Sequence, residues 1–352
     1  MSVIAIHSNL RDYTVHFHDD DSFIEGFTRF PQRLFVIDEN VWKLHGTGCL
    51  AALADSERII FPVSEERKNL GGVMELYDCL MECSSKKNMT LISIGGGIIQ
   101  DITGFVASTL YRGLNWVFVP TTLLAQADSC IGSKTSLNYK RFKNLIGTFY
   151  PPSEVHIFSE FLQTLEKSDF FSGMGEVAKL HIMGGIETIS AFTETLPDLL
   201  KRDDLVILSA IRLSLAVKLS YIEGDEFDTG RRNLLNYGHC FGHALETVSS
   251  YVIPHGQAVV VGMLVANRVA VKRGILSEDV AQRFAEKFLS LLLDCKLDLS
   301  LYSIDELITA MRQDKKRIGD GLVIVMVTDA IEMVKVDDVT SEEIEVAVKS
   351  FS

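Results

Sequence analysis

The sequence predicts an α/β domain over residues 1–160, followed by a mostly α-helical domain over residues 161–352. Two domains are expected because 352 residues exceed the usual size of one domain. In the first part, short apolar runs alternate with stretches of helical spacing, which is typical of βαβ units and a mainly parallel sheet. In the second part, strand patterns nearly vanish and apolar residues recur at helical spacing.

Each expected element rests on such a run. In the first domain, strands are expected at residues 13–17, 34–37, 59–61, 90–94, 116–119 and 155–158, and helices at 70–83 and 102–110. In the second domain, helices are expected at 205–223, 233–250, 257–273, 278–293 and 303–312, and one clear strand at 322–327.

Composition limits the possible partners. Hydrophobic residues make up 47% of the chain and charged ones 23%, and the formal net charge is −13. This charge disfavours binding to nucleic acid or to an anionic membrane. No apolar run reaches the roughly 18 residues of a membrane span, and no signal-peptide pattern opens the chain. The six cysteines form no C-x-x-C pair, so a reduced, cytoplasmic protein is expected.

A glycine turn follows the expected strand at 90–94 and opens a helix. Gly95, Gly96 and Gly97 would let a phosphate approach the backbone, where the helix N-terminus supplies N–H donors. Because the G-x-G-x-x-G fingerprint is absent, the turn predicts either a dinucleotide diphosphate site or a plain tight turn. Thr121 and Thr122 follow the next strand, where their hydroxyls would face a ligand crevice or cap a helix.

Residues 126–152 hold a basic cluster in an otherwise acidic protein. Lys134, Lys140, Arg141 and Lys143 alternate there with glycine, serine and asparagine. A charge cluster is usually a solvated face, but this composition suits a loop that cradles phosphate.

The run from Arg231 to Glu246 is expected to be a buried helix with several polar side chains. His239 and His243 are four residues apart and share one helix face, with Arg232 and Asn236 in the preceding turns. Such groups need partners when buried, which a metal ion or an anionic ligand would supply. The alternative is two histidines satisfied within the core. From the spacing alone, both histidines would be metal ligands.

Glu176 and His255 add a carboxylate and a third imidazole in the second domain. Two histidines and one carboxylate leave an open position on zinc, which is the catalytic rather than the structural pattern. Because the phosphate-binding motifs lie in the first domain and these donors in the second, the active site is expected in the cleft between the domains.

Taken together, these motifs resemble the dehydroquinate synthase family of sugar-phosphate cyclases over nearly the whole chain. The matching motifs are Gly95-Gly96-Gly97 with Asp101, Pro120-Thr121-Thr122-Leu123-Leu124-Ala125-Gln126, Asp128 with Lys134, Lys143-Asn144, Gly175-Glu176 with Lys179, and Leu235-Asn236 through Gly242-His243. The resemblance implies an α/β, Rossmann-like nucleotide-binding domain at the N-terminus and a mostly α-helical metal-binding domain at the C-terminus. It also implies NAD and a divalent zinc or cobalt ion as cofactors, a sugar phosphate as substrate, and a homodimer.

The resemblance further implies roles for individual residues. The implied metal ligands are Glu176, His239 and His255, which moves His243 from the metal to the substrate. The implied substrate residues are Asp128, Lys134, Lys143, Asn144, Lys179, Lys218, Arg232, Asn236, His243 and Arg112, the last reaching the phosphate site of the neighbouring subunit. The implied cofactor residues are Asp38, Glu65, Lys68, Gly95, Gly96, Gly97, Asp101, Thr121 and Thr122, with Lys134 and Lys143 shared. Either Lys315 or Lys316 matches a further lysine on the phosphate side.

Members of this family oxidise a ring hydroxyl with NAD, eliminate phosphate, reduce the ketone again, open the ring and close a carbocycle by an aldol reaction. Several positions here depart from the pattern of the primary-metabolism synthases. Residues 138–144 lack the usual proline and glycine, Gln100 and Gln257 replace the usual glycine and glutamate, and residues 147–152 are similar to 2-deoxy-scyllo-inosose synthases.

Lys218 and Arg232 match the pair that binds the substrate carboxylate in dehydroquinate synthases, and a buried arginine without an anion would be costly. The sequence therefore favours 3-deoxy-arabino-heptulosonate 7-phosphate, or an amino analogue, as substrate. One alternative is a cyclase of the 2-deoxy-scyllo-inosose or epi-valiolone synthase type, acting on a carboxylate-free sugar phosphate. Another is a metal- and NAD-dependent alcohol or glycerol dehydrogenase, which needs no cage for phosphate and carboxylate. A non-catalytic relative is disfavoured because no metal or phosphate position is lost.

Overall fold

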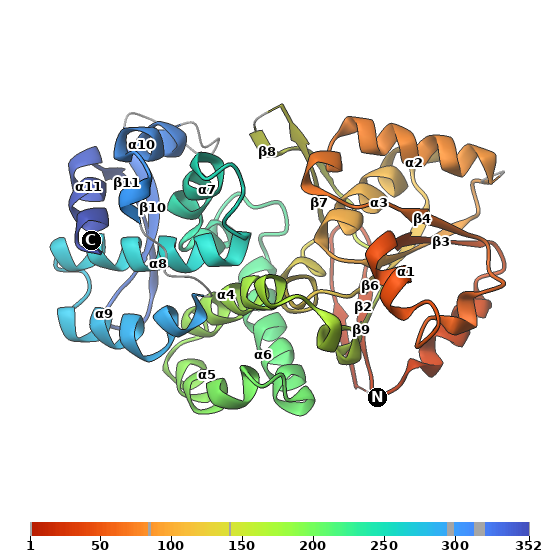
Figure 1. Ribbon diagram of the computed structural model, residues 1–352, viewed down its shortest axis with the longest axis horizontal. Helices are drawn as coiled ribbons and strands as arrows, with labels where there is room; N and C mark the ends of the chain where they lie inside the picture. Colours follow the sequence, from red (N-terminus) through yellow and green to blue (C-terminus); the bar gives the residue numbers. More distant parts are fainter. Residues whose placement is uncertain (1, 84–85, 141, 294–298, 313–320, 352) are drawn as a thin grey trace. The chain divides into compact units, whose positions relative to one another are not determined.

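The computed structural model describes residues 2–83, 86–140, 142–293, 299–312 and 321–351 (Figure 1). The chain forms two compact units, unit 1 (Met1–Leu165) and unit 2 (Glu166–Ser352). Unit 1 is an α/β unit and unit 2 is mostly helical, which confirms the predicted fold class.

Unit 1 is built on a seven-stranded sheet with the strand order β1-β2-β9-β6-β5-β3-β4. β1 is antiparallel to β2, and the other neighbouring pairs of this sheet are parallel. The six expected strands are present, and β1 is an additional edge strand whose largely exposed residues give a weak pattern. The strands are β1 (Ser2–Ile6), β2 (Tyr13–His18), β3 (Arg33–Asp38), β4 (Arg58–Phe61), β5 (Thr90–Gly95), β6 (Asn115–Pro120) and β9 (Glu154–Phe158).

Both faces of this sheet are buried, so its central strands read as continuous apolar runs. On one face, alternate residues of β3, β5 and β6 pack against the short helices η1 and η2 and against η6, which follows β9. The α-helices of unit 1 are α1 (Glu39–His45), α2 (Leu70–Glu82) and α3 (Gly97–Thr109). Its shorter helices are η1 (Asp21–Arg29), η2 (Ala51–Leu53), η3 (Glu65–Arg67), η4 (Leu110–Arg112), the π-helix η5 (Ala125–Ser129) and η6 (Ser159–Thr164).

The basic stretch forms a hairpin rather than the expected loop. β7 (Lys134–Tyr139) pairs antiparallel with β8 (Phe142–Phe149) in a separate two-stranded sheet. Thr135 and Leu137 are buried, whereas their neighbours along β7 are more exposed. Polar side chains occupy most positions of β7, so its period of two is weak in the sequence.

Three imidazoles stack on unit 1, His16 and His18 from β2 and His156 from β9, with ring centroids 4.9 Å and 5.1 Å from that of His156. His156 Nε2 lies 2.9 Å from Glu154 Oε2, and its Nδ1 lies 2.8 Å from His18 Nε2. Because an ionised carboxylate only accepts, His156 donates to Glu154 and accepts from His18. Burial, with the neighbouring rings, lowers the pKa of His18 to about 3. Burial also lowers the pKa of His156, although Glu154 opposes the shift and Arg29 adds to it. Both rings are therefore neutral at pH 7.

Acid is expected to destabilise unit 1 through this histidine stack. An unfolded histidine binds a proton near pH 6.5, whereas folded His18 binds one only near pH 3. Between these values the unfolded state holds more protons, so the free energy of unfolding falls as the pH falls, by up to about 1.4 kcal/mol per pH unit for each such ring. Urea unfolding at about pH 5 and about pH 7.5 measures this slope. His18→Gln should reduce it, and His7→Gln, at a side chain that is 90% exposed, should not. An undiminished slope in His18→Gln would contradict the assignment.

Unit 2 is organised around α8, a long helix whose residues are almost all buried (Figure 1, cyan). α8 contacts α4, α7, α9, α11 and β10. The α-helices are α4 (Lys167–Met183), α5 (Ile186–Leu199), α6 (Asp204–Ile222), α7 (His239–Val248), α8 (His255–Lys272), α9 (Glu278–Phe284), α10 (Ile304–Arg312) and α11 (Ser341–Lys349). The antiparallel pair is β10 (Leu322–Val327) and β11 (Met333–Val339). The shorter helices are η7 (Arg231–Asn236), the π-helix η8 (Ala285–Leu289), η9 (Ser290–Leu292) and η10 (Leu299–Leu301).

The helix expected at 233–250 is wrong in one respect that matters for the site. Its first turn is the separate 3-10 helix η7, and the chain breaks at Gly238, which has φ 77° before α7 begins at His239. Arg232 and Asn236 therefore do not extend the helix that carries His239 and His243. The sequence also does not predict α4, α5, α11 or β11.

Among the described residues, one helix, α6, is long and apolar enough to cross a membrane by length and composition alone. Half of its most apolar stretch is buried inside the fold, and α6 packs against α4, α5 and η7. Core helices of soluble proteins have the same length and composition, so α6 is only weak evidence for a membrane span.

Candidate active site

The strand order of unit 1 reverses beside β3, because β4 lies on one side of it and β5 and β6 on the other. Ligands of open α/β sheets bind at the carboxyl ends of strands next to such a switch point. Asp38 ends β3 there, and Gly95 ends β5 so close by that a side-chain carbon on Gly95 would lie 2.9 Å from Asp38 Cβ. Thr121 N donates to Gly95 O at 2.9 Å. The structure thus brings together the predicted cofactor residues Asp38, Gly95, Gly96, Gly97, Thr121 and Thr122.

Two of these residues also cap helices. Asp38 accepts from Asn40 N at 2.8 Å at the start of α1, and burial raises the pKa of its carboxyl. Thr122 Oγ1 accepts from Ala125 N at 3.2 Å, so its capping role is real. α3 begins at Gly97, directly after the turn, and presents its N-terminus at this edge of the sheet.

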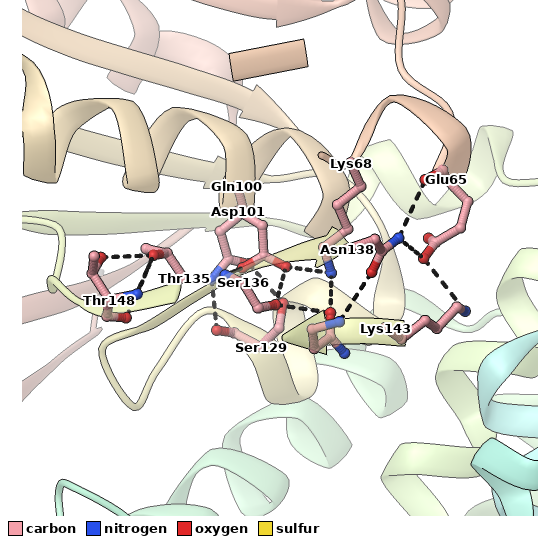
Figure 2. A network of polar contacts seen from close by, with 11 residues as sticks. Glu65, Lys68, Gln100, Asp101, Ser129, Thr135, Ser136, Asn138, Lys143 and Thr148 are labelled. Carbon is pink, nitrogen blue, oxygen red and sulfur yellow. Dashed lines mark hydrogen bonds and ion pairs between the residues drawn. The ribbon is translucent and has the colours of Figure 1, made fainter. Parts of the chain in front are cut away.

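A polar network joins the β7–β8 hairpin to α3 and to the segment before α2 (Figure 2). Asp101 on α3 accepts from Ser136 N at 2.9 Å and pairs with Lys68 Nζ at 2.6 Å. Asn144 Oδ1 accepts from Lys68 Nζ at 2.8 Å, and Asn144 N donates to Asn138 Oδ1 at 3.0 Å. The network therefore fixes the hairpin against α3.

The same network pairs two lysines that are predicted to bind a ligand, Lys68 and Lys143, each with a carboxylate. Lys143 Nζ lies 3.4 Å from Glu65 Oε1, and Lys68 is buried beside Asp101. Burial alone would raise the pKa of Glu65, but Lys143 and Lys68 lower it below its usual value. An anionic ligand at these lysines must therefore compete with Glu65 and Asp101.

Arg112 lies in a left-handed turn after α3, where Tyr111 has φ 52° and Arg112 has φ 64°. Such a conformation costs about 1–3 kcal/mol per residue and often marks a functional position. The turn precedes β6, at the amino-terminal edge of the sheet, opposite to the edge of Gly95 and Thr121. The structure therefore does not bring Arg112 together with the predicted cofactor residues at Gly95 and Thr121.

Unit 2 gathers four predicted residues in one cluster, Glu176 from α4, His239 and His243 from α7, and His255 from α8. One nitrogen of each ring lies within 4.8 Å of the other two. Glu176 Oε1 lies 3.5 Å from His239 Nε2 and 3.4 Å from His255 Nε2.

The cluster fits a divalent metal ion. A tetrahedral ion with ligand bonds of about 2.0–2.2 Å holds its ligand atoms about 3.3–3.6 Å apart. The two distances from Glu176 Oε1 fall in this range. Glu176 is fully buried, and its carboxylate makes no well-formed hydrogen bond within the described residues. A buried carboxylate needs a cation to balance its charge. Lys179 Nζ lies 2.5 Å from Oε2 and supplies one, whereas Oε1 faces the two imidazoles. These distances are compatible with Glu176, His239 and His255 as the ligand set, and His243 lies in the same cluster.

Electrostatics prepare these donors for a cation. Burial alone would raise the pKa of Glu176, but Lys179 and His255 hold it well below its usual value. Burial, with Lys179 and the neighbouring rings, lowers the pKa of His239 well below 6.5. Burial alone would also lower the pKa of His255, but Glu246 and Glu176 raise it to about 10. The site thus holds an ionised Glu176, a neutral His239 and a protonated His255 that lies between two carboxylates. A divalent cation can displace the proton of His255.

The crossing of α4 and α8 sets the distance between two of the donors. A side-chain carbon on Gly256 would lie 1.7 Å from Ser172 O, and one on Gly175 would lie 2.3 Å from Gly256 O. Gly256 N also donates to Ser172 Oγ at 3.0 Å. Because Glu176 and His255 adjoin these glycines, the backbone contact places their side chains together.

Gly256→Ala is expected to destabilise unit 2 by about 3 kcal/mol, because the backbones of α4 and α8 must separate to admit a methyl group. Thermal unfolding and metal content measure the effect, and both should fall. Gly48→Ala is a suitable control, since the nearest atom to its new side-chain carbon would be 3.7 Å away. A Gly256→Ala protein with the parent's melting temperature would show that the crossing is not tight.

The predicted carboxylate pair lies on two elements that pack together, Lys218 on α6 and Arg232 on η7, and both side chains are buried. Arg232 N donates to Asp225 Oδ2 at 2.8 Å, and its guanidinium donates to Glu226 O. Asn236 ends the same 3-10 helix. Lys315, Lys316 and Arg141 lie outside the described residues.

Comparison with known proteins identifies the family. Two family models match, 3-dehydroquinate synthase N-terminal over residues 58–172 and 3-dehydroquinate synthase C-terminal over residues 173–317. A 3-dehydroquinate synthase from Clostridium tetani is 36% identical over 319 residues, covering 90% of this chain and 82% of the relative. A 3-dehydroquinate synthase from Geotalea uraniireducens is 40% identical over 334 residues, covering 92% of each.

This chain belongs to the 3-dehydroquinate synthase family. Enzymes of this family are phosphate-eliminating cyclases. Solved structures with a similar fold include a 2-epi-5-epi-valiolone synthase from Streptomyces hygroscopicus subsp. jinggangensis with NAD+ and Zn2+ bound, at TM-score 0.86 and 24% identity, covering 99% of this chain and 98% of that chain. They also include a glycerol dehydrogenase from Schizosaccharomyces pombe, at TM-score 0.66 and 14% identity, covering 96% of this chain and 88% of that chain. Cyclases and dehydrogenases thus share the fold.

Gln100 stands where the resemblance leads us to expect a glycine, and the structure gives its side chain a partner. Gln100 Nε2 donates to Ser129 O at 2.7 Å, and Ser129 Oγ donates to Gln100 Oε1 at 2.7 Å. The pair ties the first turns of α3 to η5, which carries Asp128. The larger side chain is therefore accommodated by a partner rather than by open space.

The sequence did not single out Glu246, although it belongs to the same cluster. Its Oε2 lies 3.0 Å from His255 Nδ1, and its side chain is 2% exposed. The available signal was spacing, since Glu246 follows His239 by two helical turns on the same face of α7.

Proposed function

We propose that this protein is a 3-dehydroquinate synthase or a close variant of it. In this proposal it converts 3-deoxy-arabino-heptulosonate 7-phosphate, or an amino analogue, into a carbocycle with elimination of phosphate, using NAD and a divalent zinc or cobalt ion. The observation that carries the proposal is the donor set of Glu176, His239 and His255 in a chain of this family.

Each cofactor has residues suited to hold it. When bound, NAD would accept and return a hydride, and the metal would act as a Lewis acid. Gly95, Gly96 and Gly97 would bring backbone N–H groups and the N-terminus of α3 to the NAD diphosphate. Asp38, with Thr121 and Thr122 nearby, would bind ribose hydroxyls. Glu176, His239 and His255 would ligate the ion.

Separate cations suit the two anionic ends of the substrate. Arg232, on η7, offers a bidentate fork for the substrate carboxylate. Lys218 lies on α6, which packs against η7. Lys134, Lys143 and Lys179 would bind phosphate and ring oxygens, and phosphate would replace Glu65 as the partner of Lys143. Asp128, Asn144, Asn236 and His243 would hold hydroxyls in place, and His243 could also move a proton.

Phosphate release distinguishes the candidate functions. Metal-loaded protein with NAD is incubated separately with 3-deoxy-arabino-heptulosonate 7-phosphate, sedoheptulose 7-phosphate and glucose 6-phosphate. We expect release with the first, a carbocyclic product and no net NADH. Release only from a carboxylate-free substrate would favour a cyclase of the valiolone or inosose type, to which the departures at residues 138–144 and 147–152 would then belong. NADH without phosphate would indicate a dehydrogenase.

We also infer that the protein works in the cytoplasm as a homodimer in which Arg112 reaches the partner's phosphate site. The strained turn at Tyr111 and Arg112 supports the inference, because a functional contact would explain its retention. Sedimentation at working concentration should give a dimer, and Arg112→Ala should lower phosphate release at least about tenfold, as expected for one charged contact to phosphate. A fully active monomer would refute the inference.

A further inference from the structure

The metal cluster has a second layer of contacts on the far side of its rings. His239 Nδ1 lies 3.1 Å from Tyr237 O, and His255 Nδ1 lies 3.0 Å from Glu246 Oε2. In both rings, Nε2 is the atom that faces Glu176. Each of these two rings is thus held from behind by an oxygen acceptor.

The acceptor decides which nitrogen of His255 can bind an ion. An ionised carboxylate has no proton to donate, so when His255 gives up one proton to bind an ion, it keeps the hydrogen on Nδ1 and presents the lone pair of Nε2. A carboxylate behind the ring also makes that lone pair a better donor than a neutral amide would. Glu246 therefore acts on both the tautomer and the basicity of His255.

His255 needs such a partner because its ring is more exposed than that of His239, so packing restrains its orientation less. It is the first residue of α8, directly after Pro254, and its side chain is 31% exposed, against 13% for His239. The connection from α7 passes through Ser250 and Tyr251, whose φ values of 52° and 62° are left-handed.

Glu246 also holds this connection through its backbone. Tyr251 N donates to Glu246 O at 2.8 Å, while the Glu246 carboxylate reaches His255 at the end of the same segment. One residue near the end of α7 thus fixes both the strained turn and the ring that follows it.

We propose that Glu246 is a positioning residue of the metal centre, which orients His255 and fixes Nε2 as its ligand atom. The proposal rests on the metal centre of the proposed function. Glu246 would act through His255, because its carboxylate lies on the Nδ1 side of the ring whereas Nε2 faces Glu176.

Two variants separate geometry from charge. Glu246→Gln keeps an oxygen that accepts from Nδ1 but loses the charge, whereas Glu246→Leu loses both. Zinc affinity, measured by competition with a chromophoric chelator, should fall about tenfold in Glu246→Gln and up to about 100-fold in Glu246→Leu. The visible spectrum of the cobalt-loaded protein should change in both variants.

Glu343→Gln is the matched control, because it breaks a comparable carboxylate pair without altering His255. Glu343 Oε1 lies 2.6 Å from Arg273 Nε, and its side chain is 15% exposed. This variant should lose stability but keep the parent's zinc affinity and cobalt spectrum. A merely structural role for Glu246 would give the same result in its variants.

The outcomes distinguish this proposal from the proposed function. If the parent protein binds neither zinc nor cobalt, the metal centre itself is refuted. If the parent binds one ion but both Glu246 variants bind it within twofold of the parent, with an unchanged cobalt spectrum, the positioning role is overturned and the cyclase proposal stands.

Discussion

Replacing Glu176 with glutamine is expected to reduce bound zinc from one ion per chain to less than about a tenth of that. The carboxylate is the one anionic member of the proposed ligand set, and its Oε1 faces both His239 Nε2 and His255 Nε2. An amide oxygen is a weaker, neutral ligand, and loss of one ligand from a three-residue site removes most of its affinity. Phosphate release should be lost with the metal. Metal analysis after dialysis measures the effect.

Glu176→Gln also affects the stability of unit 2, and this effect must be separated from the loss of a metal ligand. Lys179 is 2% exposed and lies 2.5 Å from Glu176 Oε2, so removing the carboxylate leaves a buried cation unpaired. Such a change costs about 3–5 kcal/mol and could unfold unit 2. The double variant Glu176→Gln with Lys179→Met removes both charges and should fold without binding zinc. Glu187→Gln, at an exposed position of α5, is the control. A folded double variant with stoichiometric zinc would refute the ligand assignment.

Arg232→Ala is expected to lower kcat/KM for 3-deoxy-arabino-heptulosonate 7-phosphate by about 30-fold to several thousand-fold. A buried, charge-assisted contact to a carboxylate contributes about 2–5 kcal/mol, and each 1.4 kcal/mol corresponds to a factor of ten. Arg232→Lys should recover only part of the loss, because an ammonium group lacks the planar fork. Steady-state phosphate release gives kcat/KM for each variant.

The neighbouring Arg231 provides a matched control. Its guanidinium lies 4.6 Å from the centre of the Tyr221 ring and donates to Ser220 O at 3.2 Å, on an exposed part of η7. Arg231→Ala should therefore change kcat/KM by less than about threefold, as expected for an exposed charge. Equal losses in the two variants would argue that Arg232 supports η7 rather than the substrate. Equal losses on carboxylate-free substrates would reach the same conclusion.

The sequence by itself determined the fold class and the types of donor group. The strands of unit 1 are buried on both faces, so β3, β5 and β6 appear as continuous apolar runs that need no tertiary information. The glycine turn at Gly95 could be located because it directly follows such a run and opens a helix. The carboxylate and imidazole donors of unit 2 could be named from their chemistry and from the family resemblance.

Only the tertiary structure decided how these residues meet. Gly238 breaks the helix expected at 233–250, and the contact of Gly175 with Gly256 brings Glu176 to His255 from a distant part of the chain. The pairing of Lys143 with Glu65, and of His255 with Glu246, likewise joins separate elements. The physical reason is that local patterns record which face of an element is buried. The partner on that face is set by backbone approach and packing between segments, which leave no period in the sequence.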